Sequence, residues 1–413
     1  MSEEEFDTPE LRAYRLAARE WLKGAMKPLD RAVDGTVIES DRSDPDEVRL
    51  ARARRLQRQL FDAGYAGLTF PKEFGGGGVD LAHERVFFQE SRGYEMPTPF
   101  LAVSLNILGK TLLAYGTQQQ KREHLPKMLS GEEIWLQLLS EPSGGSDLAG
   151  LVTRATRDGD TFVLNGQKTW STGANFADFA LCPARTNWDV PKHKGISMFI
   201  VKLRQPGIEI RPIKQMNAES DFFEEFLTDV VLPADSIVGD ENDGWRITRG
   251  LLEIEHEWVG RSGGGALPPA DVDELVTAAR RSGLIRDVGA RRRVADVYVI
   301  QAAQRALTER ISRGMATGAY NPGYGGLLKL GNDFVRQRRA EVGVSLAGSA
   351  SVAWQPGAVG SDCLPLYLRS RSASIAGGTT EILRNNVSER ALGLPREPPA
   401  FDRDLPFNKV PKN

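Results

Sequence analysis

The residues best suited to bind a ligand lie between Leu139 and Asp147, where the sequence reads LSEPSGGSD. The proline fixes its own φ and ends the apolar run before it. Gly144 and Gly145 can take a positive φ and let backbone N–H groups come close to a bound molecule. Ser140 and Ser146 place hydroxyls on both sides of this turn. The pattern predicts a surface for an anionic or polar edge, although an ordinary strand-to-turn connection could use the same residues.

A second candidate segment follows at residues 161–173, which read TFVLNGQKTWSTG. Its alternating residues, with Asn165-Gly166 between two strand-like runs, predict a β-hairpin. The segment ends in Trp170 and two hydroxyl residues. A tryptophan at a strand end is most often part of the core. Beside two hydroxyls it could instead stack on a planar cofactor while the hydroxyls bond the cofactor's edge.

The motifs LLSEPSGGSD, NGQKTW and WSTG resemble, in residues and spacing, the flavin-binding signature of the acyl-CoA dehydrogenase family, especially actinobacterial-type members. Further pieces of the family pattern recur in order along nearly the whole chain. The resemblance implies non-covalently bound flavin adenine dinucleotide (FAD), held by Leu139, Ser140, Gly145, Ser146, Trp170, Ser171, Thr172, Thr379 and Glu381. It implies an acyl-CoA substrate contacted by Ser146, His256 and Gly377.

Removal of an α-proton from a thioester requires a positioned base, and the family carries this glutamate in one of two places. One is a loop before the last helix. Here that loop reads Ile375-Ala376-Gly377-Gly378-Thr379, so a glycine stands at the position of the base. The other place is the first helix of the C-terminal bundle. Counting on from Gly244-Trp245, the resemblance assigns that role to Glu255.

The helix around Glu255 carries three carboxylates, at 253, 255 and 257. Helical spacing puts 253 and 257 on one face, together with Arg249 and Arg261, which indicates a solvated face. The neighbours of Glu255 at three and four residues are all apolar: Leu251, Leu252, Trp258 and Val259. A carboxylate pointing into an apolar interior has a raised pKa, which suits a general base. The alternative is that Glu255 pairs with an arginine of another helix.

Three departures from the family pattern concern how the cofactor and the partner subunit are held. His256 follows the helix glutamate where the family usually has arginine, the Arg-x-x-Phe-Gly segment is missing around 276–296, and Val344 replaces a glutamine. They favour an unequal partner subunit, because some family members in bacterial steroid degradation are heteromers in which one subunit type lacks the base.

Composition excludes several other classes of protein. A formal net charge of −2 gives no reason to expect a nucleic-acid partner. Two cysteines and four scattered histidines do not make a disulfide framework or a metal site. The acidic N-terminus has no secretory h-region, and no apolar run reaches about 18 residues. We therefore expect a protein of the cytoplasm that has no membrane span.

Hydrophobic periodicity predicts an α+β multidomain chain: helices first, then strands, then helices again. The predicted parts are an N-terminal α-helical domain at 1–134, a middle antiparallel β-barrel domain at 135–243, a C-terminal helical bundle at 244–395 and an extended Pro-rich tail at 396–413. The resemblance implies the same order. It also implies a dimer of dimers. The end of the helix predicted at 325–349 supports such an assembly, because it is too apolar to remain an exposed face.

The expected activity is that of an oxidoreductase of lipid metabolism, in fatty acid β-oxidation or steroid degradation. The resemblance implies α,β-dehydrogenation of an acyl-CoA to the 2,3-enoyl-CoA, with Glu255 as base, flavin N5 as hydride acceptor and an electron-transfer flavoprotein as the electron acceptor. Two alternatives stay open. One is a non-catalytic or half-site subunit of a heteromeric enzyme, and the other is a flavin oxidase or monooxygenase on the same fold.

Overall fold

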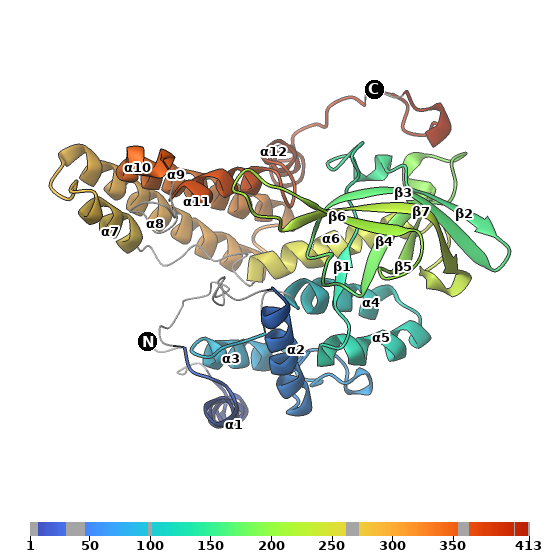
Figure 1. Ribbon diagram of the computed structural model, residues 1–413, viewed down its shortest axis with the longest axis horizontal. Coiled ribbons are helices and arrows are strands. Elements are labelled where there is room, and N and C mark those ends of the chain that lie inside the picture. Colours follow the sequence, from blue (N-terminus) through green and yellow to red (C-terminus); the bar gives the residue numbers. More distant parts are fainter. Residues whose placement is uncertain are drawn as a thin grey trace. The chain divides into compact units, whose positions relative to one another are not determined.

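The computed structural model describes residues 7–29, 46–97, 101–261, 272–353, 363–399 and 401–411, without the side chains of 257, 259–261 and 316. The chain divides into two compact units (Figure 1). The first consists of Met1–Ile213, Asp221–Val259 and Phe401–Asn413, and the second of Lys214–Ser220 and Gly260–Ala400. Each unit is described by itself.

The N-terminal part of the first unit is helical, as predicted. Thr8 caps the first helix by accepting a hydrogen bond from the Leu11 N–H at 3.2 Å, and a proline occupies the first helical position. A capping box at Thr117 opens the last helix, and Gly131 ends it with φ +81°. The helices are α1 Pro9–Ala25, α2 Asp46–Asp62, α3 Leu81–Ser91, a π-helical turn at Ser104–Gly109, α4 Lys110–Tyr115 and α5 Gln118–Ser130.

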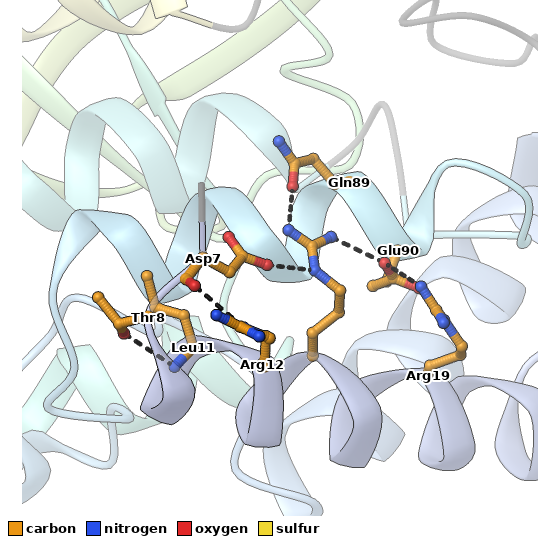
Figure 2. Close-up of polar contacts among 8 residues, drawn as sticks. Asp7, Thr8, Leu11, Arg12, Arg19, Gln89 and Glu90 are labelled. Atoms are coloured by element: carbon orange, nitrogen blue, oxygen red, sulfur yellow. Dashed lines mark hydrogen bonds and ion pairs between the residues drawn. The ribbon is translucent and has the colours of Figure 1, made fainter. Parts of the chain in front are cut away.

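A buried arginine joins α1 to α3. Arg15, only 5% exposed, donates to the Asp7 carboxylate at 2.6 Å, to Glu90 at 2.8 Å and to Gln89 at 2.8 Å. Figure 2 shows these acceptors converging from the start of α1 and the end of α3. Arg19 adds a second arginine to Glu90, at 2.7 Å. Because each partner is charged or strongly polar and largely out of water, the network depends on every member being present.

We expect Arg15→Met to detach α1 from α3. Methionine fills the stem's volume but leaves the Asp7 carboxylate without its main partner, while Glu90 keeps only Arg19. Removing one partner of a hydrogen-bonded ion pair destabilises the packing that the pair holds in place. Amide hydrogen exchange of α1 should become markedly faster while exchange in the β-sheet stays unchanged. Arg12→Met is the matched control, since Arg12 is exposed and makes one bond to a backbone carbonyl at 3.1 Å. Equal exchange in the two variants would contradict the assignment.

The middle of the first unit is one sheet, with strand order β6-β7-β3-β2-β4-β5-β8 and β1 beside β4. Most of the pairs are antiparallel, but β1 and β2 each pair in parallel with β4. Alternate residues of these strands form a core that includes Phe162, Leu164, Phe199 and Leu227. The strands are β1 Trp135–Gln137, β2 Arg154–Asp158, β3 Thr161–Thr172, β4 Phe179–Arg185, β5 Ile196–Lys202, β6 Ile208–Ile213, β7 Phe222–Pro233 and β8 Ile237–Val238.

The predicted hairpin at Asn165-Gly166 is wrong, because β3 continues through both residues. The turn lies earlier, at Gly159, whose φ is +57°, and the missed strand β2 is the partner of β3. Asn165 instead forms two hydrogen bonds with Asp229 of β7, at 3.0 and 2.9 Å, beside an irregularity in the β3–β7 register. Gly166 is required there for space, since a Cβ would lie 2.5 Å from the Thr153 hydroxyl. The Asn-Gly pair therefore marks a bulge.

The second unit is a helical bundle, as predicted. A shared core joins Leu275 of α7, Val294 of α8 and Val342 and Leu346 of α9. The apolar end of α9 is thus covered within the unit, and it gives no support for a dimer of dimers. The helices are α7 Asp273–Arg281, α8 Val288–Ala316, α9 Gly325–Ala347, α10 Ser349–Val352, α11 Cys363–Ser370 and α12 Thr380–Asn386, with α6 Gly244–Arg261 leading into them from the first unit.

The tail departs from a simple extended segment, because its last part rejoins the first unit. Phe407 donates its N–H to the Val190 carbonyl at 2.8 Å, and the Arg185 guanidinium lies 3.6 Å from its ring centroid. Arg185 also donates to the Ala149 carbonyl at 2.7 Å. The chain therefore passes from the first unit to the second and back again.

Among the described helices, none is both long and apolar enough to cross a membrane. The described residues likewise contain no cluster of histidine, cysteine or acidic side chains that could hold a metal ion.

Candidate active site

The turn after β1 has a compact, hydrogen-bonded base and an exposed far side. Glu141 and Gly144 exchange backbone hydrogen bonds of 3.1 and 3.0 Å, which closes the turn over Pro142 and Ser143. Gly145 and Ser146 beyond it are exposed. Neither glycine takes a positive φ, contrary to the use expected for them. The turn therefore presents backbone and a hydroxyl to the surface without any left-handed residue.

A buried ion pair holds this turn against β3. The Lys168 ammonium lies 2.8 Å from the Glu141 carboxylate, and both side chains are almost completely excluded from water. Lys168 also donates to the carbonyls of Pro183 at 2.9 Å and Leu139 at 3.3 Å. Burial acts to raise the pKa of Glu141, but the charge and hydrogen bond of Lys168, together with hydrogen bonds from Thr153 and Val152, outweigh it and the pKa is lowered. The pair fixes the position of Leu139 and Ser140.

Trp170 stands out of β3 at a second bulge, between Thr169 and Ser171. Its φ is +66°, a left-handed conformation that is uncommon for a bulky residue. The side chain is 58% exposed and touches Phe222 edge-on, with ring centroids 5.9 Å apart. Thr172 is exposed as well, whereas the Ser171 hydroxyl points inward and donates to Glu225. Only the backbone of Ser171 is therefore available to a molecule on the outer face.

Glu255 lies on α6 with its carboxyl turned toward β1. Gln137 Nε2 donates to Glu255 Oε2 at 3.3 Å. Leu251 is buried, and Leu252 and Trp258 pack against the same apolar cluster. Burial raises the pKa of the Glu255 carboxyl, while the Gln137 hydrogen bond and nearby His256 act to lower it. No arginine pairs with Glu255 in the part of the chain that the structure describes.

The other two carboxylates of this helix are Glu253 and Glu257, and the structure describes only the side chain of Glu253. Glu253 is exposed and lies 3.6 Å from Arg249, which agrees with a solvated face. The side chains of Glu257 and Arg261 lie outside the described residues. His256, expected beside the substrate, is exposed.

The remaining predicted residues lie in the second unit, in one short stretch that leads into the first turn of α12. Gly377 and Gly378 have φ of +65° and +93°, which only glycine adopts readily. Thr379 caps the helix by accepting from the Ile382 N–H at 3.2 Å. Glu381 is exposed and lies 3.8 Å from Arg384. Position 377 is a glycine, so it carries no carboxylate.

Two polar residues of the site were missed from sequence. Gln137 sits at the end of β1 and was hidden in an otherwise apolar run. Glu225 of β7 is fully buried, between Phe223 and Leu227 on the inner face of the strand. Its alternation with two apolar residues was the available signal, because a carboxylate on a strand's core face requires a specific partner.

Three family models match successive parts of the chain: "Acyl-CoA dehydrogenase, N-terminal domain" at residues 8–132, "middle domain" at 137–230 and "C-terminal domain" at 242–392. Among curated proteins, acyl-CoA dehydrogenase IpdE1 of Mycobacterium tuberculosis is 34% identical over 384 residues, which cover 93% of this chain and 98% of that protein.

Solved structures are similar over almost the full length. One titled "Tcur3481-Tcur3483 steroid ACAD" superposes with a TM-score of 0.73 at 28% identity, covering 95% of this chain and 99% of the other. The ChsE4-ChsE5 complex from Mycobacterium tuberculosis gives a TM-score of 0.69 at 24% identity, covering 96% and 100%. The second likeness concerns the fold alone. These findings agree with the predicted order of helices, strands and helices.

Proposed function

The chain belongs to the acyl-CoA dehydrogenase family of flavin-dependent oxidoreductases, and from that premise we propose that it oxidises an acyl-CoA thioester to the 2,3-enoyl-CoA. The observation that carries this proposal is Glu255. It is a carboxyl among apolar side chains with a raised pKa and one amide partner, in the same compact unit as the exposed turn and the displayed tryptophan. A base that removes an α-proton near neutral pH needs such an environment.

FAD fits the exposed surface of the first unit that includes Ser146, Trp170 and Thr172, called here the outer face. The exposed Trp170 ring, held by a left-handed backbone, offers a flat surface for a planar ring system. Thr172 and Ser146 carry exposed side chains whose hydroxyls could bond polar edges of the cofactor. Lys168 and the Thr169 N–H hold the carbonyls of Leu139 and Ser140, respectively. When bound, FAD supplies the acceptor for the β-hydride. Thr379 and Glu381 are proposed contacts from the second unit.

In the proposed reaction Glu255 takes the α-proton as its carboxylate, and the Gln137 amide orients that carboxylate. The apolar neighbours Leu252 and Trp258 keep water from the carboxyl and so keep its basicity high. Ser146, Gly377 and His256 are proposed to contact the thioester or the coenzyme. We propose a steroid-derived or other lipid acyl group, supported by the similarity to the structure titled "Tcur3481-Tcur3483 steroid ACAD". An electron-transfer flavoprotein is the proposed electron acceptor, and a cytoplasmic location stays a prediction.

A half-site role within a heteromer is the second candidate. Gly377 occupies the loop position of a base, and Val344 replaces the glutamine of the family pattern. Similarity to the structure titled "Tcur3481-Tcur3483 steroid ACAD" supports assembly from unequal subunits. In that case Glu255 would still serve the one site that this chain completes. A dimer of dimers remains the proposed assembly for both candidates.

The test is to purify the chain alone and together with proteins encoded by its genomic neighbours. We expect yellow flavin absorbance in at least one preparation, and reduction of an artificial electron acceptor with some members of a panel of acyl-CoA thioesters. Absorbance only in the co-purified sample would favour the heteromer. If no preparation ever binds flavin or oxidises a thioester, the proposed function is wrong.

A further inference from the structure

A fully buried carboxyl lies directly beneath the segment that displays Trp170. The Ser171 hydroxyl of β3 donates to Glu225 Oε1 of β7. Glu225 is completely inaccessible to water and Ser171 is 5% exposed. Within the described part of the chain, Oε2 of Glu225 is buried and has no hydrogen-bond partner. A carboxyl in such a place depends on Ser171 for its solvation.

Ser171 lies at the end of the bulge from which Trp170 projects. The bulge places it opposite Phe223, while Thr169 lies opposite Glu224, so Trp170 is the extra residue. The left-handed φ of Trp170 costs free energy that the flanking contacts must supply. With Ser171 held inward, Trp170 and Thr172 are turned outward.

We propose that Glu225 is a positioning residue: by holding the Ser171 hydroxyl inside the sheet, it fixes the bulge that presents Trp170 and Thr172 on the outer face. The flavin part of this inference rests on the proposed function. The coupling of Glu225 to Trp170 does not, because it concerns only this chain's own backbone and side chains.

The charged groups around Glu225 make the contact depend on pH. Lys168 of β3 lies opposite it in the register but is bonded to Glu141, and Cys182 of β4 and Glu224 of its own strand are the other titratable neighbours. On the other neighbouring strand, β6, the residue paired with Glu225 is the apolar Ile210. Burial raises the pKa of Glu225 to about 7; Ser171 and Lys168 act to lower it and Glu224 to raise it. The carboxyl therefore changes charge near neutral pH.

The two charge states hold Ser171 with different strength. A carboxylate accepts a charge-assisted hydrogen bond, roughly twice as strong as the bond that a neutral acid accepts. Above neutral pH the bulge should be held firmly, and below it Trp170 should move more freely. Glu225→Gln keeps an acceptor for Ser171 but cannot ionise, so it should behave at every pH as the wild type does in acid.

The first test uses the flavin-free full chain. Because there are seven tryptophans, the contribution of Trp170 is taken as the difference in near-ultraviolet circular dichroism and fluorescence between each protein and its Trp170→Phe counterpart. Between about pH 5.5 and 8.5 this difference should show a transition centred near pH 7 in wild type. It should be absent in Glu225→Gln and in Ser171→Ala. Glu224→Gln, one residue away and half-buried, is the control and should retain the transition.

A pH-independent Trp170 signal in wild type, or an equal transition in Glu225→Gln, would overturn the proposal. Ser171→Ala guards against a folding defect, because it removes the hydroxyl and leaves the carboxyl in place.

The second test measures FAD affinity. The wild-type dissociation constant should be several-fold larger at about pH 6 than at about pH 8, and that of Glu225→Gln should not change. If the chain bound no flavin, the proposed function would fail while the tryptophan transition still decided the role of Glu225. An affinity with the same pH dependence in both proteins would refute the link to the flavin surface.

Discussion

Glu255→Gln is expected to lower turnover by about 10²-fold or more, the usual scale for loss of a general base. Glutamine keeps the size of the side chain and can still hydrogen-bond the Gln137 amide, which lies 3.3 Å from the carboxylate. It cannot accept the α-proton. Flavin content and the thermal transition should stay at wild-type values, because α6 keeps its apolar packing through Leu251 and Trp258.

The pH profile gives this prediction a second readout. The base acts as a carboxylate and its pKa is raised by burial, so wild-type turnover should increase as the pH rises through that pKa. The variant should lack this limb. Glu253→Gln is the matched control, since Glu253 is on the same helix, exposed and 3.6 Å from Arg249, an interaction worth about 0–1 kcal/mol. Unchanged turnover in Glu255→Gln at equal flavin content would place the base elsewhere or in a partner chain.

The helices and most strands could be predicted because their signals are local. Thr8-Pro9, Thr117 and Gly131 begin or end helices through contacts within a few residues. The apolar neighbours of Glu255 follow from helical spacing alone, and the structure confirms the contrast between Glu253 and Glu255.

The errors occur where a distant segment decides the local conformation. Asn165-Gly166 carries a strong hairpin signal, yet the close approach of Thr153 and the two bonds to Asp229 keep it within a strand. The docking of Phe407 on the first unit depends on residues near 188, more than 200 positions away. Such contacts leave no periodic pattern in the sequence around them.

The direction of the Ser171 hydroxyl could not be predicted for the same reason, since it depends on a strand that is distant in the sequence. Ser171 was expected to bond a ligand through its hydroxyl, but a strand bulge turned it inward onto Glu225. The motif singled out the segment that displays Trp170, whereas the direction of each side chain required the register with β7. A motif alone therefore does not assign the role of each hydroxyl.

Lys168→Met should destabilise the first unit strongly. Methionine fills the space of the lysine stem, but the Glu141 carboxylate loses its ammonium partner at 2.8 Å in a place where neither side chain is exposed to water. Two backbone donors remain, Val152 N–H at 2.6 Å and Thr153 N–H at 3.0 Å. They do not neutralise the charge. An uncompensated buried carboxylate typically costs about 3–5 kcal/mol, which should appear as a lower denaturant midpoint for the first unit.

The pH dependence distinguishes loss of charge from loss of packing. In wild type the pKa of Glu141 is lowered, so the pair's contribution is complete above the unfolded pKa of about 4.5 and is lost as the pH falls through the folded value. In the variant, burial without Lys168 should raise the pKa above the unfolded value. The loss of stability caused by the unpaired Glu141 carboxylate should then be complete at neutral pH and should shrink as the pH falls toward about 4.5.

Two comparisons decide whether the buried pair is responsible. Glu141→Gln combined with Lys168→Met should be less destabilised at neutral pH than Lys168→Met alone, because no buried charge is left unpaired. Arg211→Met breaks an exposed pair with Glu209 at 2.7 Å, in the same sheet, and should leave the denaturant midpoint almost unchanged. A deficit in Lys168→Met that is independent of pH and unrelieved by Glu141→Gln would mean that methionine disturbs packing. In that case the position of the Leu139–Ser140 backbone would not depend on the ion pair.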